Sequence, residues 1–511
     1  MSPSPHRWTA LAVLAAAVLL LAIDNTVLAL AVPALTADLS PTAEQVLWIG
    51  DVYSLALAGL LVLMGNLADR FGRKRVLLLG AAAFGAVSLL AAFAGSPGQL
   101  IAARLALGVA GATLMPSTLS LIRNLFPDDT ERARAIAIWS TAFGAGSAIG
   151  PLTGGFLLEH FWWGSVFLIN VPVMIVVLVS GWLLLPESRD PQPGRFDVLS
   201  AGLSMAAIVP LVFAIKHVAG HGADAVTAGC VLAGVTAGWL FVRRQRRLDQ
   251  PMLDVELFRS PAFSGAVAAN VIAIFALTGL LFFFSQYLQL ARGLTPLRAG
   301  LAELPATLAS IAVVALIGVA VTRLGRGRAI AFGLATAAAG LTLVAAAARG
   351  PYLWMGFALV PIGLGIGLAM TLTGDAIVSA APPRKAGSVS AITEAANELG
   401  VVLGIAVLGS LVSFVYRGAV MIPSGLSAED TAAVRDSLGP ALQVLGPQSP
   451  AADAARAAFI AGMQVTSLVA AALTFAAALL AWRLIPSRPQ QASSPSTARA
   501  EGRRRGRPGR R

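Results

Sequence analysis

Charged side chains are scarce in this chain of 511 residues. Only 12% of the residues are Asp, Glu, Lys or Arg, whereas 57% are hydrophobic and the mean hydropathy is +0.78. A soluble protein carries about 25% charged residues. The low charge content therefore indicates that most segments of the chain contact lipid.

Cysteine, lysine and histidine are also rare. The single cysteine, Cys230, excludes an internal disulfide and a cysteine metal cluster. None of the three lysines (Lys74, Lys216 and Lys385) stands in the Gly-Lys-Ser or Gly-Lys-Thr order of a phosphate-binding loop. No stretch between the apolar runs is long enough for a soluble catalytic domain. We therefore expect neither an enzyme nor an ATP-driven pump, and we expect no metal and no cofactor.

Long apolar runs dominate the chain instead. A helix needs about 20 apolar residues to cross a membrane core about 30 Å thick. The sequence therefore predicts an all-α membrane protein with 14 transmembrane helices. The predicted spans are 9–33, 46–66, 76–95, 99–122, 135–157, 163–185, 199–216, 225–242, 262–290, 297–321, 329–348, 352–375, 388–415 and 457–483.

The basic residues are distributed unevenly between the two sides of this bundle. If the N-terminus is cytoplasmic, 29 of the 37 Lys and Arg residues lie on the cytoplasmic side and seven on the other, with Arg104 inside a span. This asymmetry follows the positive-inside rule. It predicts a multi-pass protein of the bacterial plasma membrane with both termini in the cytoplasm.

The net charge of +12 has the same origin and does not require nucleic acid as a partner. The Arg-rich C-terminal tail is rich in Pro, Ser and Gly, so we expect it to be disordered. Contact of its arginines with anionic lipid is the favoured interpretation, and binding to nucleic acid is the weaker alternative.

Two related loops divide the chain into repeats. GNLADRFGRKR follows the second span, from Gly65 to Arg75, and GVAVTRLGRGR follows the tenth, from Gly318 to Arg328. The offset of 253 residues places both loops between the second and third helices of a six-helix unit. We predict two pseudo-symmetric bundles with two helices inserted between them, a 6 + 2 + 6 order. The predicted parts are a cytoplasmic N-tail (1–8), the N-terminal bundle (9–185), the inserted helices with cytoplasmic linkers (186–260), the C-terminal bundle (261–486) and the basic tail (487–511).

The first of these loops has the composition of a gating loop. Gly65 and Gly72 permit tight turning, and the acid Asp69 stands among basic residues that include Arg70 and Arg73. A charge network across neighbouring helix ends is therefore expected. A loop that only obeyed the positive-inside rule would need neither the acid nor the glycines. The second copy has lost the acid, so any latch of this kind is asymmetric.

The longest outer segment, 416–456, lies in the C-terminal bundle. Ser427 can cap one short helix and Ser449 the next, with a break at Gly439–Pro440. Two interpretations stay open: a small helical hairpin over the outer face, or an irregular loop.

Several motifs resemble those of the major facilitator superfamily. GNLADRFGRKR is similar to its loop signature, LIAARLALGVAGA (Leu100 to Ala112) to its fourth-helix motif with an intramembrane arginine, and GAGSAIGPLTGG to the fifth-helix motif of its exporters. IDNTVLALAVP and WIGDVYSLALAG resemble segments of the fourteen-span drug:proton antiporters, in the quaternary-ammonium branch of the QacA, SmvA and LfrA type. The likeness extends from about residue 10 to residue 485. It implies the major facilitator fold, a monomer, and energy from a proton gradient.

Carboxylates inside the apolar runs are the main candidates for coupling. A charge at the membrane centre costs roughly 2.5–3.5 kcal/mol on insertion scales, so it must face a partner or a cavity. Asp24 lies in the outer half of span one, and Asp51 lies just inside the outer end of span two. Two acids in one cavity could bind a lipophilic cation and a proton in turn. The alternatives are a structural hydrogen-bond anchor to Thr26 or to a neighbouring helix for Asp24, and a solvated helix-end acid for Asp51.

A second acidic station is predicted in span thirteen. Glu394, Asn397 and Glu398 fall on one helical face, near the cytoplasmic half of the span. They could receive the drug or release the proton. The alternative is an ion pair with Arg384 or Lys385.

Other charged residues near or inside the spans are given structural roles. Glu303 is expected to pair with Arg298 or to be solvated at the interface, and Asp375 to be a helix-end charge. Arg104 is the only basic residue predicted inside a span, and it must pair with an acid, most simply one in span one. The family resemblance implies that Arg104 relays protons or locks helices.

Aromatic side chains could stack on cations in a desolvated cleft, although packing or an interfacial position is the more common role of each alone. The candidates are Trp48, Tyr53, Phe143, Phe283 and Tyr287.

The fifth predicted span carries a glycine strip. Gly146, Gly150 and Gly154 recur every four residues, which lets another helix approach closely. Pro151 lacks the N–H that a helix interior uses, so a bend is expected there. A close, bent contact of this kind could seal two rocking halves.

These features together favour a proton-coupled multidrug efflux antiporter. It would export cationic amphipathic compounds, such as quaternary ammonium biocides and ethidium, by alternating access, with protons and the lipid bilayer as its other partners. The Ala-, Gly- and Arg-rich composition also suits a dedicated exporter of one antibiotic that confers self-resistance. A nutrient importer fits less well because the exporter motif is intact. Outside transport, a membrane sensor is disfavoured because the sequence shows no long cytoplasmic output domain. A simple channel is disfavoured because it needs neither two pseudo-symmetric repeats nor buried acids.

Overall fold

The computed structural model describes residues 6–190, 197–249, 251–380 and 386–487. The predicted tail after residue 487, most of the N-tail, and Arg384 and Lys385 therefore lie outside the described residues. The first half of the chain contains α1 (Arg7–Leu39), α2 (Ala43–Phe71), α3 (Arg73–Ala92), α4 (Pro97–Leu125), α5 (Asp129–His160), α6 (Ser165–Leu168), α7 (Asn170–Leu184), α8 (Val198–His221), α9 (Ala225–Gln245) and η1 (Val255–Arg259). The second half contains α10 (Pro261–Gln286), η2 (Tyr287–Ala291), α11 (Pro296–Ala312), η3 (Val313–Leu316), α12 (Ile317–Leu324), α13 (Arg326–Ala347), α14 (Tyr352–Ser379), α15 (Ala386–Leu403), η5 (Gly404–Leu408), α16 (Gly409–Ala419), α17 (Ala428–Asp436), α18 (Leu438–Leu445) and α19 (Pro450–Leu484).

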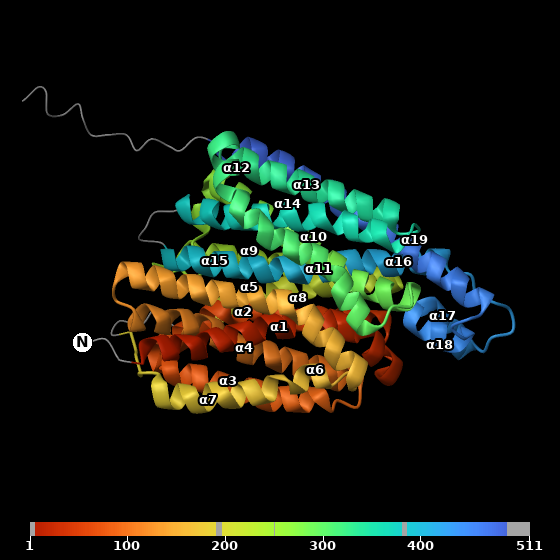
Figure 1. Ribbon diagram of the computed structural model, residues 1–511, viewed down its shortest axis with the longest axis horizontal. Helices are drawn as coiled ribbons and strands as arrows, with labels where there is room; N and C mark the ends of the chain where they lie inside the picture. The colour runs from red at the N-terminus through yellow and green to blue at the C-terminus, as the bar shows by residue number, and fades with distance from the viewer. Residues whose placement is uncertain (1–5, 191–196, 250, 381–385, 488–511) are drawn as a thin grey trace, which may run out of the picture.

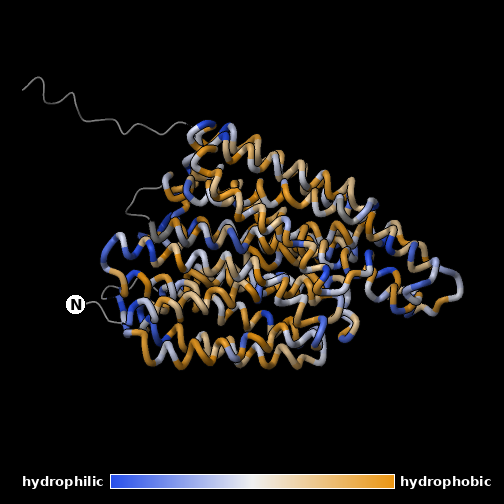
Figure 2. Tube along the Cα trace, in the orientation of Figure 1, coloured by the Kyte–Doolittle hydropathy of each residue, from blue (hydrophilic) through white to orange (hydrophobic). Residues whose placement is uncertain are grey.

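Fourteen helical segments of the described chain are long and apolar enough to cross a membrane. This confirms the predicted all-α membrane fold and the number of spans. Four spans consist of more than one element: α6 with α7, α10 with η2, α11 with η3 and α12, and α15 with η5 and α16. Hydrophobic residues cover the helices along their length, and hydrophilic residues gather mainly near the ends of the bundle (Figure 2).

The helices lie side by side with their long axes roughly aligned (Figure 1). Elements α1 to α7 form one group, and α10 to α16 form the other together with α19. The helix α8 packs against α2, η5 and α16, where the two groups meet, and α9 packs against α8. We call the end that carries α17 and α18 the hairpin end, and the end that carries the N-terminus the terminal end.

The segment between α16 and α19 is helical rather than irregular. Ser427 caps α17 by accepting a hydrogen bond from the Asp430 N–H, and Ser449 caps α19. The break between the two short helices falls at Ser437, not at Gly439–Pro440. Pro440 instead sits in the first turn of α18, where its missing N–H leaves no intrahelical hydrogen bond unmade.

Two glycines make the tight turns of the related loops. Gly72 joins α2 to α3 with a φ of 117°, and Gly325 joins α12 to α13 with a φ of 77°. Only glycine adopts these angles without steric cost. Each turn is also crowded: a Cβ would lie 2.6 Å from Glu187 Oε1 at Gly72 and 2.0 Å from the Ser487 carbonyl oxygen at Gly325.

The two groups of helices touch closely at the hairpin end. A Cβ at Gly300 of α11 would lie 2.3 Å from the carbonyl oxygen of Pro151 of α5, and one at Gly155 would lie 2.8 Å from Leu297 Cα. Among the described residues, three hydrogen bonds join the groups at this end: Leu297 N–H and Thr295 Oγ1 donate to Glu159, and Gln289 Nε2 donates to the Leu30 carbonyl. The short helices α17 and α18 are tied to the first group as well, by Ala43 N–H to Asp436 and Gln443 Nε2 to the Ala37 carbonyl. The bundle is therefore closed at the hairpin end.

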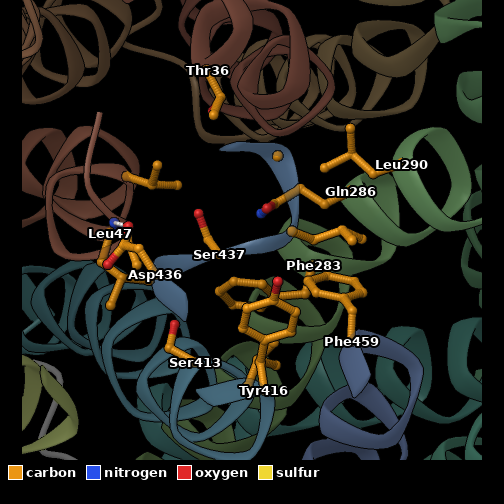
Figure 3. Close-up of a pocket in the computed structure, with 15 residues that line it drawn as sticks. Thr36, Leu47, Phe283, Gln286, Leu290, Ser413, Tyr416, Asp436, Ser437 and Phe459 are labelled. Carbon is orange, nitrogen blue, oxygen red and sulfur yellow. Dashed lines mark hydrogen bonds between the residues drawn. The ribbon is translucent and has the colours of Figure 1, made fainter. Parts of the chain in front are cut away.

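A small cavity remains within this closed region (Figure 3). Thr36, Leu47, Phe283, Tyr416 and Ser437 are among the side chains around it, and its volume is about 40 Å³. That volume holds a few water molecules at most. This cavity is too small to hold a drug-sized molecule.

Candidate functional site

The carboxylate of Asp24 and the guanidinium of Arg104 form an ion pair between α1 and α4. Asp24 Oδ2 lies 3.0 Å from Arg104 Nη1, and both side chains are at most 1% exposed. Arg104 also donates from Nε to the Ile49 carbonyl oxygen at 3.3 Å, and its guanidinium lies 4.7 Å from the centre of the Tyr53 ring. The single arginine predicted inside a span thus meets an acid of span one.

Two neutral polar residues complete this ion pair. Asn170 Nδ2 donates to Asp24 Oδ1 at 2.6 Å and lies 3.2 Å from Ser88 Oγ, and both residues are buried. Helices α3 and α7 are thereby joined to α1 and α4. Neither Asn170 nor Ser88 was predicted from the sequence. The available signal was weak: a lone amide at the start of an apolar run.

Tyr53 fits into a slot made by two glycines of α4. A Cβ at Gly108 would lie 2.5 Å from the Tyr53 carbonyl oxygen, and one at Gly111 would lie 3.0 Å from its phenol oxygen. The slot brings the ring under Arg104 and leaves Tyr53 buried. Close contact between α2 and α4 therefore positions the cation of the first ion pair.

A second buried ion pair links α2 to the inserted helix α8. Lys216 Nζ lies 2.7 Å from Asp51 Oδ1, and both side chains are fully buried. The ammonium also lies 3.5 Å from the centre of the Trp48 ring. The alternative of a solvated acid at Asp51 is therefore wrong. Arg104 is also not the only basic residue inside a span, because α8 continues past Lys216 to His221 and buries it.

Glu398 lies near this region, on α15 where it packs against α2. The side chain is buried, and its neighbours include Ser54 and Tyr53. Ser54 is the hydroxyl nearest to the Glu398 carboxylate, and Asp51 Oδ2 lacks a hydrogen-bond partner among the described residues. Unpartnered buried polar atoms are uncommon, so this is a place where a proton or a polar ligand could bind.

Glu394 belongs to a separate polar chain in the second half of the molecule. Asn397 Nδ2 lies 3.4 Å from Glu394 Oε2, and Asn397 Oδ1 accepts from Asn270 at 2.7 Å. Thr373 Oγ1 then donates to Asn270 Oδ1 at 3.0 Å. The chain joins α15, α10 and α14. The alternative partners Arg384 and Lys385 lie outside the described residues.

The two remaining acids differ in their surroundings. Glu303 is 5% exposed, its Oε1 has no hydrogen-bond partner, and no ion pair to Arg298 forms in the described structure. The prediction of pairing or interfacial solvation is therefore wrong, because α11 packs this face against α5 and α14. Asp375 pairs with Arg326 of α13 at 2.7 Å and is half exposed, as a helix-end charge would be.

Comparison with known proteins shows which family this fourteen-span bundle with buried charges belongs to. Residues 14–405 match the family model described as Major Facilitator Superfamily. The chain belongs to this superfamily. It is 48% identical to the multidrug efflux pump LfrA of Mycolicibacterium smegmatis over 93% of this chain and 96% of that one. It is 35% identical to the methyl viologen resistance protein SmvA of Salmonella typhimurium, over 89% and 93%, and 34% identical to the tetracenomycin C resistance and export protein of Streptomyces glaucescens, over 93% and 91%.

A solved structure shares the fold. A bacterial homologue of the human lysosomal transporter Spinster, in an inward-facing conformation, matches with a TM-score of 0.66 and 17% identity, over 94% of this chain and 97% of that one. The family resemblance inferred from the motifs is thus confirmed. As a major facilitator protein, the chain is a transporter rather than an enzyme.

In this major facilitator protein, the loop Gly65 to Arg75 forms a charge network at the terminal end. Asp69 Oδ1 accepts from Arg73 Nε at 2.8 Å, and Glu187 lies 3.8 Å from Arg75. Glu187 was not predicted as a partner of this loop, because it follows α7, 113 residues beyond Lys74 of the loop. Arg70 lies over the ring of Phe71, and Gly65 faces Pro116.

The glycine strip of α5 packs against α1. A Cβ would lie 2.4 Å from the Leu19 carbonyl oxygen at Gly146, 1.9 Å from Thr26 Oγ1 at Gly150 and 2.8 Å from Val27 Cγ1 at Gly154. Thr26 donates to the carbonyls of Ala22 and Ile23, and the described part of the chain shows no hydrogen bond between Thr26 and Asp24. The strip therefore holds the Asp24 helix close to α5 within one group, and the contact between the two groups is made instead by the neighbouring Pro151 and Gly155.

The candidate cation-stacking residues divide into three groups. Trp48 and Tyr53 face the protein's own cations, Lys216 and Arg104. Phe283 packs against Gly409 and lines the small cavity of Figure 3, and Tyr287 donates to the Ala348 carbonyl, so both belong to the closed hairpin end. Phe143 is half-buried on α5.

Proposed function

We propose that this transporter is a proton-coupled antiporter that exports cationic amphipathic compounds, such as quaternary ammonium biocides and ethidium. The observation that carries the proposal is the pair of buried carboxylates Asp24 and Asp51, each neutralised by a basic side chain of the protein. The resemblance to LfrA and SmvA, named for multidrug efflux and methyl viologen resistance, supports the same conclusion.

Charge balance gives a reason for coupling at such a site. A carboxylate in a low-dielectric interior is stable only when a cation or a proton compensates its charge. A proton and a lipophilic cation can therefore replace each other there, while simultaneous binding to one carboxylate is disfavoured. Exchange of one for the other across the membrane is antiport.

The positive-inside rule sets the direction of transport in this proposal. It places the termini in the cytoplasm, so the hairpin end faces outward. The close contacts at the hairpin end then disfavour an outward-facing state, and a compound would enter from the cytoplasm or the inner leaflet. Opening would require the contact between Gly300 and Pro151 to separate.

A dedicated antibiotic exporter is the second candidate. The likeness to the tetracenomycin C resistance and export protein favours it, because the alignment with this chain covers 91% of that relative and 96% of LfrA. The two candidates share a mechanism and differ in how many compounds they accept.

Efflux of ethidium from loaded cells tests the proposal. Cells that express the wild type should lose ethidium fluorescence rapidly, and a protonophore should stop the loss. Asp24→Asn should abolish it, whereas Asp453→Asn, which changes an exposed acid at the hairpin end, should retain it. Efflux that persists with the protonophore or in Asp24→Asn would overturn proton coupling at Asp24. If the wild type exports no cation at all, a dedicated antibiotic exporter becomes the favoured function.

A further inference from the structure

Lys216 occupies a site with the chemistry of a cation-binding pocket. Its ammonium lies 2.7 Å from the Asp51 carboxylate and 3.5 Å from the centre of the Trp48 ring. A carboxylate beside an aromatic face is an arrangement by which proteins bind quaternary and lipophilic cations. The second oxygen of Asp51, Oδ2, has no hydrogen-bond partner within the part of the chain that the structure describes. The subsite is thus built for a cation and is filled by the protein itself.

The helix that supplies this cation stands between the two six-helix groups. Lys216 lies in the last two turns of α8, which packs against α2 on one side and against η5 and α16 on the other. Removal of the ammonium from Asp51 would change a contact at the junction of the two groups. The occupant of this subsite is therefore positioned to influence how the groups move relative to each other.

A second carboxylate offers the ammonium an alternative position. Glu44, Trp48 and Asp51 are spaced i, i+4 and i+7 along α2, so they share one face of the helix. Trp48 Nε1 donates to Glu44 Oε1 at 3.4 Å, and Glu44 is within electrostatic range of Lys216. Movement of the ammonium from Asp51 toward Glu44 would follow the face of the Trp48 ring.

Space for that movement exists at the hairpin end. A cavity of about 250 Å³ is lined by Glu44 and Lys216, together with His221, Ser413, Arg417 and Asp436. Asp436 is engaged by Arg417, with 2.7 Å between Nη2 and Oδ1, so Glu44 is the available acceptor. The ammonium would then be hydrated instead of buried, which offsets the loss of its partner.

We propose that Lys216 is a tethered competitor for a cation subsite formed by Asp51 and Trp48. An incoming lipophilic cation takes the place of the ammonium beside Asp51, and Lys216 moves to Glu44. The charge in the buried site stays constant, since one cation replaces another. When the cation leaves, Lys216 returns, so the carboxylate is never left uncompensated. This inference rests on the proposed export of cations and names the subsite where they bind.

Binding of tetraphenylphosphonium to the purified full-length protein at pH 8 tests the inference. A tethered competitor lowers the fraction of free subsites and so weakens the apparent affinity. Lys216→Met, which keeps an unbranched side chain one atom shorter and removes the charge, should lower the Kd by roughly tenfold or more. Lys216→Arg should raise the Kd, because a guanidinium binds a carboxylate through two hydrogen bonds. The Arg variant retains the charge, so it also serves if the Met variant folds poorly.

Glu44→Gln separates this role from a structural one. Glu44 acts on the subsite only through Lys216, so Glu44→Gln should raise the Kd in the Lys216 protein and leave it unchanged in the Lys216→Met protein. Equal Kd values for wild type, Lys216→Met and Lys216→Arg would overturn the inference. If the wild type still exported ethidium in that case, the proposed function would stand without the inference. Absence of both binding and efflux in the wild type would overturn the proposed function and the inference together.

Discussion

Asp24 Oδ2 lies 3.0 Å from Arg104 Nη1, and neither side chain is more than 1% exposed. Asn170 binds the other oxygen of the same carboxylate, at 2.6 Å. The charge of Asp24 is thus fully compensated when no cationic ligand is present. Any proton or cation that acts at Asp24 must compete with Arg104, just as one that acts at Asp51 must compete with Lys216.

Removal of one partner of the first pair should destabilise the protein. Asp24→Asn or Arg104→Met leaves a buried charge or a buried acceptor unpaired, and such changes typically cost about 3–5 kcal/mol. The double variant removes both charges and should recover most of that stability without recovering efflux. Thermal unfolding of the detergent-solubilised variants measures this. Additive losses in the double variant would show that the pair is not coupled.

The ion pair shows how much of the site was predictable from sequence. A lone arginine inside an apolar run must find an acid, and span one offered Asp24, so the partner could be named in advance. Asn170 could not be named, because a neutral amide has several possible partners and no charge that demands one. The fold itself was predictable because span number depends only on the length and hydrophobicity of each run.

Lys216 shows where the same reasoning failed. The predicted span ended at this residue because the following sequence, His217 to His221, is more polar. The helix continues for those five residues, and Lys216 is buried against α2. Whether a lysine near a helix end is buried or faces solvent depends on tertiary packing. We found no sequence motif in α8 that predicts the burial of Lys216. Glu303 was misassigned for a similar reason, since its burial depends on α5 and α14.

The glycine strip of α5 should tolerate no side chain where it meets α1. A Cβ at Gly146 would lie 2.4 Å from a backbone oxygen of Leu19, so Gly146→Ala must move one helix and should cost about 1–3 kcal/mol. Gly144 lies in the same helix with open space around its Cα. Gly144→Ala is the matched control and should be neutral or slightly stabilising, because alanine favours helices. Equal melting temperatures for the two variants would contradict the close contact.

Closure of the hairpin end should depend on Gly300. A Cβ there would lie 2.3 Å from the Pro151 carbonyl oxygen, so Gly300→Ala should shift the population toward states in which α5 and α11 are apart. Cysteines at Glu159 and Thr295, which are in hydrogen-bond contact, report closure through cross-linking in a Cys230→Ser background.

We expect the Gly300→Ala variant to cross-link severalfold more slowly than the parent. Gly356→Ala is the control, since nothing lies within 4 Å of the position of its Cβ. Unchanged cross-linking in Gly300→Ala would mean that the hairpin end closes without this contact.

Acid should weaken the N-terminal cap that Asp224 makes on α9, outside the membrane. The weakening should begin only when the pH falls below the ordinary pKa range of a carboxyl group. The hydrogen bond from the Thr227 backbone N–H, and then the one to His217, hold the pKa of Asp224 well below its usual value. A depressed pKa in the folded state means that the stabilisation is complete above the unfolded-state pKa, about 4, and is lost as the pH falls below it.

Asp224→Asn should therefore differ from the wild type in melting temperature by a constant amount from pH 8 to pH 9, above the ordinary titration range of histidine, since His217 is a partner of Asp224. The carboxylate's own contribution should be lost only in acid. Efflux measured between pH 6 and pH 8 should have the same pH dependence in both proteins, because Asp224 is a helix cap outside the spans. A different pH dependence of efflux in the two proteins would show that Asp224 takes part in coupling.

Cation uptake by proteoliposomes tests proton-coupled export most directly. Purified protein is reconstituted, a pH gradient is imposed, and the movement of ethidium into the compartment from which protons leave is followed by fluorescence. We predict accumulation only while the gradient persists, proton efflux that rises when ethidium is added, and neither effect with Asp24→Asn. Accumulation without a gradient, or coupled exchange of normal rate in Asp24→Asn, would contradict antiport at this carboxylate.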